Sequence, residues 1–372
     1  MSSWMISLLA LLSSNVEGCE TYRKVVDAVC ADSCIGNFVG LCPRALVVSQ
    51  GGLDAGNCQD EGYSVADGSL DQKAGPCGTL HFLQYTKPAA RGSKTTITIA
   101  PGVEMPLANL GGVSSAPSNY SAWLDVGGRG IDTALTYGDA TQKSVAAAMA
   151  ATSVARKDIF LTSKVPCCHD YPLPGIAHDC QGEYNGTALE SIKKDFAILG
   201  KMDLILLHWP CATTEQTVAA YADLETALEQ GMTRAIGVSN FNSTLLAAML
   251  PQVKVAPAVN QCGHSVGAHN ASHNPNLGGD DATVKWCAAH GISYSAYSPL
   301  GGLNGLDIFK DATVKRIAAV HSVSPAQVAL RWLVQQEISI VTAADSEAYC
   351  AEDVDLFSFE LTTAEMGTLA AL

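Results

Sequence analysis

From Thr95 to the last residue, short apolar segments alternate with Ala- and Leu-rich segments. The apolar segments are the expected strands, at residues 107–112, 130–134, 159–164, 204–209, 235–240, 258–262, 293–298 and 338–343. The helices expected between them include residues 144–153, 188–199, 219–231, 280–291 and 324–336. This alternation predicts a parallel sheet covered on both faces. Eight such units over residues 95–372 favour a closed (β/α)8 TIM barrel over a doubly wound sheet.

Two local patterns refine this α/β prediction. The stretch "TTITIAPGVEMPL" alternates around Pro101-Gly102, which predicts a hairpin in front of the barrel. No G-x-G-x-x-G motif follows an early strand, so a Rossmann domain has no support in the sequence.

The first residues have the pattern of a signal peptide. Residues 4–12 are apolar, and Val16 and Gly18 are small enough for a cleavage site near residue 18. The segment before residue 4 lacks the Lys or Arg with which a signal peptide usually begins. The alternative to a signal peptide is a first helix packed into a core. Residues 1–18 are therefore predicted to direct the chain into the secretory pathway, for secretion or a lumenal location.

A Cys-rich segment, residues 19–94, follows the predicted signal peptide. Six of the 13 cysteines lie in it: Cys19, Cys30, Cys34, Cys42, Cys58 and Cys77. This density favours disulfides in an oxidising compartment, with the pairing left open. The Gly-, Asp- and Ser-rich stretch around residues 49–78 is expected to form loops, and no partner of the segment is indicated. Glycosylation sequons agree with a secreted glycoprotein, at Asn119, Asn185, Asn242 and Asn270.

Charge and hydropathy exclude two classes of partner. The net charge of −14 argues against nucleic acid, because phosphate binding needs a basic face. No apolar run reaches the roughly 18 residues that a membrane span needs.

Polar residues stand at or just beyond the ends of the predicted strands. They are Asp132 and Tyr137 after the second strand, Lys164 in the third, His208 in the fourth, Ser239 and Asn240 in the fifth, Gln261 in the sixth, and Tyr297 and Ser298 in the seventh. A barrel gathers the carboxyl ends of its strands around one mouth. Each residue alone has the alternative of a satisfied polar group in the core. Their recurrence at separate strand ends favours a common site.

The residue types at this mouth suit proton transfer by a phenol. Free tyrosine has a pKa near 10 and needs help to act near neutrality. An ammonium about 4 Å away stabilises a phenolate by roughly 4 kcal/mol at an effective dielectric of about 20. Lys164 is expected to supply this charge to Tyr137, and Asp132 to keep Lys164 charged. His208 is then free to hydrogen-bond a carbonyl oxygen of the substrate.

The remaining mouth residues fit an aromatic amide. Tyr297 offers a flat face on which a ring can stack, and Ser239, Asn240 and Gln261 offer polar contacts to an amide. Together with the phenol, they predict a carbonyl site beside a place for nicotinamide.

The chain resembles the aldo-keto reductases over about residues 95–372. The resemblance rests on "GGRGIDTALTYGD", "IFLTSK", "KMDLILLHWP", "GMTRAIGVSNFN", "APAVNQCGH", "AYSPLG" and "SPAQVALRW", in the family's order. It implies a barrel that binds NADPH or NADH without a Rossmann fold and reduces an aldehyde or ketone. Tyr137 matches the family's acid, Lys164 and Asp132 match the residues that tune it, and His208 matches the residue that orients the substrate.

The resemblance also implies the cofactor contacts. The matching positions are Ser239, Asn240 and Gln261 for the carboxamide, Tyr297 for the stacked ring, Ser298 and Leu300 for the pyrophosphate arm, and Glu352 at the adenosine end. At that end, Ala343, Ala344 and Tyr349 replace the family's Lys, Ser and Arg. Because Asp345, Glu347 and Asp353 lie close by in the sequence, a 2′-phosphate is expected to bind poorly there. This puts NADP in doubt and favours NAD or weak cofactor binding.

The substrate side departs from the family as well. Val113 and Pro166 stand where aromatic residues are common, whereas Trp209 is kept. The expected pocket, lined by His208, Trp209 and Val113, is therefore wider and less aromatic.

The cysteines after residue 94 could form disulfides, bind zinc or remain as free thiols. Disulfides are favoured over zinc for the cluster Cys167, Cys168, His169, His178 and Cys180. A bridge from Cys167 or Cys168 to Cys211 is one hypothesis, and no metal is expected. Cys262, Cys287 and Cys350 are predicted to be buried thiols.

Two other functions compete with carbonyl reduction. A barrel that has lost turnover and serves as a binding or sensing module would explain the altered adenosine end. A glycosidase-like barrel needs two carboxylates at strand ends, and only Asp132 stands out there.

Overall fold

The computed structural model describes residues 46–48, 64–75, 78–86, 94–113, 117–167, 186–270, 277–301 and 306–372. The chain divides into two compact units, residues 1–93 with 315–324 and residues 94–314 with 325–372. The predicted signal peptide, the six cysteines before residue 80 and Asn185 lie outside the described residues. What the sequence indicates for them therefore stays a prediction.

The first unit contains strands that the sequence analysis did not expect. The strands β1 (Leu46–Val48), β2 (Ser64–Gly75) and β3 (Gly78–Thr86) form an antiparallel sheet in the order β1-β3-β2. The prediction of loops around residues 49–78 is wrong for β2. Thr, Phe and Tyr residues in β3 favour a strand, and β2 ends at Gly75 just before β3, a spacing typical of a hairpin.

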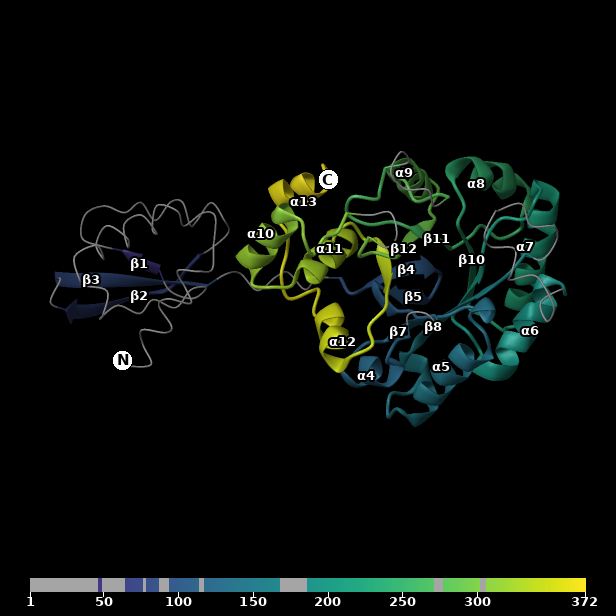
Figure 1. Ribbon diagram of the computed structural model, residues 1–372, viewed down its shortest axis with the longest axis horizontal. Coiled ribbons are helices and arrows are strands. Elements are labelled where there is room, and N and C mark those ends of the chain that lie inside the picture. Colours follow the sequence, from purple (N-terminus) through teal and green to yellow (C-terminus); the bar gives the residue numbers. More distant parts are fainter. Residues whose placement is uncertain are drawn as a thin grey trace. The chain divides into compact units, whose positions relative to one another are not determined.

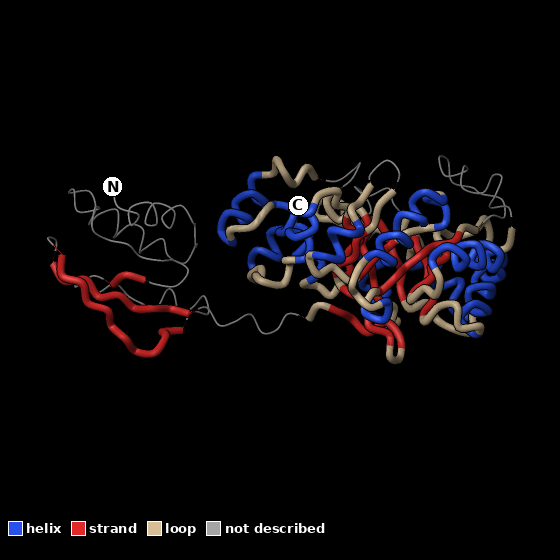
Figure 2. Tube along the Cα trace, turned by 90° about the horizontal axis from the view of Figure 1, so that it is seen from below, coloured by secondary structure: helices blue, strands red, loops and turns tan. Residues whose placement is uncertain are grey.

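The second unit is a closed barrel of parallel strands ringed by helices (Figures 1 and 2). Its strands are β6 (Ala108–Leu110), β7 (Gly130–Asp132), β8 (Phe160–Val165), β9 (Leu204–Leu207), β10 (Ala235–Ser239), β11 (Val259–Gly263), β12 (Ser293–Tyr297) and β13 (Ser339–Thr342). Each pairs with the next in sequence, and β13 pairs with β6 to close the ring. The predicted (β/α)8 barrel is confirmed, with each expected strand in place.

The strands are buried on both faces, because one face points into the barrel and the other lies under the helices. Every residue of β8, β9, β10 and β11 is buried. Such strands appear in the sequence as continuous apolar runs. Neighbouring strands also approach closely: a Cβ on Gly237 would lie 2.4 Å from the carbonyl oxygen of Val259.

Helices follow the strands along the chain, and most of them are capped at the amino-terminal end by a side chain. They are α4 (Tyr120–Asp125), α5 (Asp139–Ala151), α6 (Ala188–Leu199), α7 (Thr214–Glu229), α8 (Ser243–Met249), α9 (Asp281–Ala289), α10 (Ala312–His321), α11 (Pro325–Val334), α12 (Glu347–Val354) and α13 (Thr363–Leu369). Thr187, Thr213 and Thr362 form capping boxes at α6, α7 and α13. Within the described residues, none of the helices is both long and apolar enough to cross a bilayer.

The predicted hairpin lies at the amino-terminal end of the strands. It consists of β4 (Thr96–Ala100) and β5 (Val103–Pro106), and Gly102 adopts a φ of 72° in its turn. Arg234, just before β10, donates to the Gly102 carbonyl at 2.7 Å. The buried Asp203, just before β9, pairs with Arg234 at 2.9 Å and with Arg156 at 3.0 Å. These contacts stabilise the end of the barrel away from the polar mouth residues.

A disulfide joins Cys167, just after β8, to Cys211, just after β9. This confirms the hypothesis of a bridge to Cys211, with Cys167 as the partner. Cys168, His169, His178 and Cys180 lie outside the described residues. In the described part of the chain, no group of three or more His, Cys, Asp or Glu side chains is arranged to hold a metal ion.

The predicted buried thiols are confirmed. Cys262, Cys287 and Cys350 are free and buried. Burial raises their pKa, to about 12 for Cys262 and about 11 for the other two. They therefore remain protonated near neutral pH.

Candidate active site

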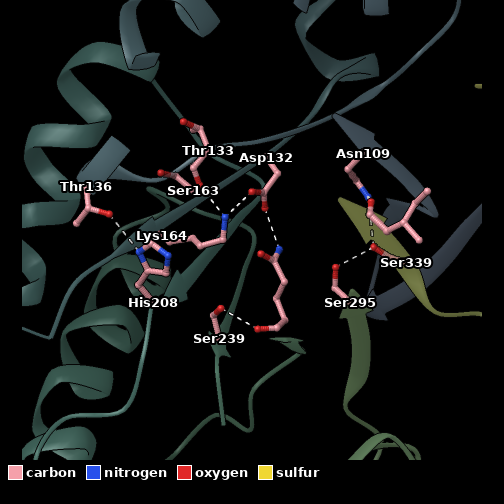
Figure 3. Close-up of polar contacts among 12 residues, drawn as sticks. Asn109, Asp132, Thr133, Thr136, Ser163, Lys164, His208, Ser239, Ser295 and Ser339 are labelled. Carbon is pink, nitrogen blue, oxygen red and sulfur yellow. Dashed lines mark hydrogen bonds and ion pairs between the residues drawn. The ribbon is translucent and has the colours of Figure 1, made fainter. Parts of the chain in front are cut away.

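The residues expected to act together lie at one end of the barrel. Asp132 ends β7, Tyr137 ends the short 3-10 helix η3 (Leu135–Tyr137), Lys164 lies in β8, and His208 follows β9 directly. Figure 3 shows the Lys164 side chain reaching between Asp132 and His208. The structure thus brings together four side chains that lie in or just after three neighbouring strands, β7, β8 and β9.

Lys164 is the centre of this cluster. Its Nζ donates hydrogen bonds to Asp132 Oδ1 and, at 3.1 Å, to the Thr133 carbonyl. Only 1% of the residue is exposed. Burial acts to lower the lysine pKa, but the charge of Asp132 and then Tyr137 outweigh it, so the pKa is raised. The side chain therefore holds a buried ammonium.

Tyr137 lies against this ammonium. Lys164 Nζ is 5.3 Å from the centroid of the Tyr137 ring, and a hydrogen bond with Tyr137 contributes to the raised lysine pKa. The ring of His208 lies edge-on to that of Tyr137, with the centroids 5.8 Å apart. Tyr137 is half-buried, so it contacts a cation and an imidazole and still meets solvent.

His208 is a neutral imidazole in this site. Burial and then the Lys164 ammonium hold its pKa well below the ordinary value. Its Nδ1 lies 3.3 Å from Thr136 Oγ1, and its ring stacks on that of Trp209 at a centroid distance of 4.1 Å. The imidazole N–H is on Nε2 in the tautomer in which Nδ1 accepts the hydrogen bond from the Thr136 hydroxyl. Trp209, predicted to line the substrate pocket, is buried behind His208.

The predicted amide-binding residues are connected to this cluster. Gln261 Nε2 donates to Asp132 Oδ2 at 2.9 Å, so Asp132 is held by both Lys164 and Gln261. Ser239 Oγ donates to the Gln261 carbonyl at 2.7 Å. The Gln261–Asp132 contact was not predicted, because residue spacing alone does not fix which side chains meet across the barrel.

Asn240 links the predicted stacking ring to the rest of the site. Tyr297 donates its hydroxyl proton to Asn240 Oδ1 at 2.9 Å. Asn240 Nδ2 donates to the His208 carbonyl at 2.9 Å and to Ser239 Oγ at 3.1 Å. The hydroxyl end of Tyr297 is thus fixed in place, and its ring is half-buried.

The residues matched to the cofactor's outer parts lie after β12 and β13. Ser298 is exposed, with a φ of 51°, and Leu300 is half-buried. On α12, Tyr349 is 59% exposed and Glu352 is half-buried.

Asp353 was counted in the sequence among the acidic residues near the expected 2′-phosphate, but its side chain does not face solvent. It is buried and accepts a hydrogen bond from Thr342 Oγ1 at 2.9 Å, and burial raises its pKa to about 7. Asp345 and Glu347 remain exposed at the start of this segment. The acidic character of the predicted adenosine end therefore comes from them and not from Asp353.

Tyr120, at the start of α4, was missed by the sequence analysis. It is 5% exposed, and its hydroxyl has no hydrogen-bond partner among the described residues. A Cβ on Gly112 would lie 3.0 Å from this hydroxyl. The pKa of Tyr120 is raised by burial, then by Asp132 and Tyr137. The site thus has a second phenol near its charged pair. Val113, which follows Gly112, is half-buried.

The fold and the cluster at its mouth are those of a (β/α)8-barrel enzyme. The chain belongs to the aldo/keto reductase family, whose model matches residues 114–372. Members of this family are oxidoreductases that reduce carbonyl groups and generally use NAD(P)H.

Individual relatives agree with this assignment. An aldo-keto reductase of Mycolicibacterium paratuberculosis is 33% identical over 258 residues, covering 68% of this chain and 80% of the relative. A methylglyoxal reductase of Yersinia pestis is 29% identical over 249 residues, covering 67% and 80%. The crystal structure of an aldo-keto reductase from a deep-sea metagenome has a TM-score of 0.63 at 27% identity, covering 74% and 94%.

Proposed function

We propose that the protein reduces an aldehyde or ketone to the alcohol with a nicotinamide cofactor, and that Tyr137 donates the proton. The observation that carries this proposal is the buried Lys164 ammonium, bonded to Asp132 and lying 5.3 Å from the Tyr137 ring centroid. A neutral His208 lies edge-on to that ring, with the two ring centroids 5.8 Å apart.

The residues around the cluster fit the nicotinamide end of such a cofactor. Gln261, Ser239 and Asn240 are polar groups suited to a carboxamide, and they lie between the cluster and Tyr297. The bond from Tyr297 to Asn240 holds a ring face in a fixed orientation for stacking. When bound, the reduced nicotinamide supplies the hydride that the carbonyl carbon accepts.

The chain's own residues then handle the carbonyl oxygen. His208 donates a hydrogen bond from Nε2 to that oxygen, which orients the substrate. As negative charge develops there, Tyr137 transfers its phenolic proton to the oxygen and becomes a phenolate. The Lys164 ammonium stabilises this phenolate, and Asp132 keeps Lys164 charged and in position. Solvent then restores the proton of Tyr137, so that the residue is ready for the next turnover. The carbonyl compound has gained one hydride and one proton and leaves as the alcohol.

Measurement of nucleotide oxidation tests this function. The full chain is mixed with NADH or NADPH and a panel of aldehydes and ketones, and loss of the reduced nucleotide is followed by absorbance. We expect turnover in the wild type and a loss of about 100-fold or more in Tyr137→Phe, because the general acid is removed. Nucleotide binding, measured by protein fluorescence, should be unchanged in Tyr137→Phe.

Two results would contradict the proposal. One is full turnover in Tyr137→Phe, which would mean that another group donates the proton. The other is the absence of both binding and turnover in the wild type with either nucleotide. That second result would favour the alternative function, a barrel that binds or senses a ligand without turnover, which draws its support from the altered adenosine end.

We further propose that NADH is preferred over NADPH. Ala343 and Tyr349 supply no cation for a 2′-phosphate, while Asp345 and Glu347 are exposed beside them. The double variant Ala343→Lys/Tyr349→Arg should tighten NADPH binding by about tenfold or more and leave NADH binding nearly unchanged. Ala351→Lys, an exposed position on the same helix, is the control for a cation placed elsewhere on α12. Equal tightening for both nucleotides would show that no selective phosphate site was rebuilt.

We propose a location in the secretory pathway. The sequence pattern of residues 1–18 and the cysteine density before residue 80 support it. The Cys167–Cys211 disulfide agrees with an oxidising compartment. Attachment of glycans to the sequons at Asn119, Asn242 and Asn270 would be observed by mass spectrometry of the protein purified from its source.

A further inference from the structure

A second buried carboxylate lies behind Lys164, on the helix side of β8. Asp195, on α6, has no exposed surface. Its Oδ2 accepts a hydrogen bond from Ser163 Oγ, and its Oδ1 accepts one from Gln142 Nε2. Ser163 immediately precedes Lys164 on β8, so Asp195 is bonded to the residue next to the buried ammonium.

Asp195 also reaches Lys164 by a second route. Gln142, on α5, accepts a hydrogen bond from Thr133 Oγ1 at its Oε1, at 2.7 Å. The Thr133 carbonyl in turn accepts the hydrogen bond from Lys164 Nζ at 3.1 Å. Figure 3 shows Thr133 and Ser163 near the Lys164 amine. Helices α5 and α6 are therefore linked to β8 in one chain of polar contacts, which runs from the Lys164 amine through Thr133 to Ser163, the residue next to Lys164.

The polar partners of Asp195 are side chains that hold it without neutralising it. Ser163 and Gln142 are uncharged donors, and Lys164 is the cation whose charge acts on Asp195. Burial raises the pKa of Asp195 to about 7, against the hydrogen bonds and the lysine charge, which lower it. The carboxyl group is thus poised to gain or lose a proton in the range where an enzyme works.

The other charged groups on neighbouring elements have partners of their own. On α5, Lys143 pairs with Asp139 at 2.7 Å on the exposed face. On α7, Asp223 accepts from the Leu189 amide, and Glu225 accepts from the amide of Lys254 at 2.6 Å. Beyond Lys164, Asp132 is bonded to the lysine itself.

We propose that Asp195 is a positioning residue, an internal counter-charge that acts through Lys164 and sets how readily Tyr137 gives up its proton. This inference rests on the proposed function and extends it to the pH dependence of the reaction. An ionised Asp195 adds negative charge beside Lys164, which disfavours the Tyr137 phenolate. A protonated Asp195 leaves Lys164 with a single carboxylate partner, and the phenolate forms more easily.

The direction of the effect follows from these charges. Below about pH 7, Asp195 is protonated, and Tyr137 is the stronger acid. Above about pH 7, Asp195 is ionised, and Tyr137 is then a weaker acid than when Asp195 is protonated. The variant Asp195→Asn stays neutral throughout, so its Tyr137 should ionise at lower pH than in the wild type.

The test is a titration of Tyr137 in the full chain, without cofactor or substrate. Absorbance of the ionised phenol is measured against pH, and the curve of the matching Tyr137→Phe protein is subtracted. A unit charge roughly 10 Å away shifts an ionisation by about one pH unit at an effective dielectric of about 20. We therefore expect Tyr137 in Asp195→Asn to ionise about one pH unit lower. Glu225→Gln removes another buried carboxylate from the helix layer and should leave the curve unchanged.

A second variant keeps the carboxyl group in place. Ser163→Ala removes a hydrogen bond that lowers the pKa of Asp195, so an inflection of kcat near pH 7 should move to higher pH. In Asp195→Asn that inflection should disappear, while KM stays within about twofold. The Ser163→Ala measurement remains informative if Asp195→Asn proves too unstable to titrate.

The outcomes separate this inference from the proposed function. Identical Tyr137 titrations in the wild type and Asp195→Asn, or a kcat inflection that Ser163→Ala does not move, would overturn the role of Asp195. If the titration shifts although the wild type reduces no carbonyl, Asp195 retains its role and the reductase proposal fails. If carbonyls are reduced and the titrations coincide, the reductase proposal stands and Asp195 has only a structural role.

Discussion

Replacing Lys164 with Met should lower kcat/KM for carbonyl reduction by about 100- to 1,000-fold. The reason is the loss of the cation that stabilises the Tyr137 phenolate, an effect of roughly 4 kcal/mol for charges about 4 Å apart at a dielectric of about 20. Met has nearly the length of Lys and fills the same space without a charge. The measurement is the rate of nucleotide oxidation at saturating cofactor, with cofactor binding determined in parallel.

A control is needed because Lys164→Met leaves Asp132 buried without its cation. Breaking a buried ion pair from one side costs about 3–5 kcal/mol, so the single variant is also expected to be less stable. Asp132→Asn/Lys164→Met removes both charges and should recover much of that stability. It should remain as inactive as the single variant. Recovery of activity in the double variant would show that the lysine charge serves folding and not the reaction.

Removal of the disulfide in Cys167→Ala/Cys211→Ala should lower the free energy of unfolding by about 4 kcal/mol. The bond closes a loop with a sequence separation of 44 residues, and its loss frees that loop in the unfolded chain. Denaturant unfolding of the barrel, followed by Trp fluorescence, measures the change.

The matched control for this prediction is Cys262→Ala, which removes a buried free thiol without breaking a bond. It should cost much less than the double variant. The expectation would be contradicted if Cys167→Ala/Cys211→Ala and the wild type had the same denaturant midpoint of unfolding. A peptide map of the wild type in which Cys211 is free would also contradict it.

The barrel was predictable because its pattern repeats. Each strand is a short apolar run between helix-like segments, and closure in order then places Asp132, Lys164 and His208 around one mouth. The hairpin at Gly102 was equally clear from local alternation. For both the barrel and the hairpin, the pattern of apolar residues along the chain is enough to predict the element. No contact between distant residues has to be known.

Other features depend on packing that the sequence pattern does not encode. Tyr120 and Asp195 lie on helices, so strand ends give no hint of them, and their partners are set by how α4, α5 and α6 lie on the barrel. Asp353 follows Glu352 by one residue, and a helix turns by about 100° per residue, which sends one side chain outward and the next inward. The sheet of residues 46–86 was missed because Gly, Asp and Ser are frequent in residues 49–78, which include β2.

The proposed proton transfer depends most on the effect of the Lys164 charge on the phenol of Tyr137. Absorbance titration of Tyr137, with the Tyr137→Phe curve subtracted, measures this in the wild type and in Asp132→Asn/Lys164→Met. We expect Tyr137 to ionise at a clearly lower pH in the wild type than in the double variant. The same ionisation pH in both proteins would contradict it.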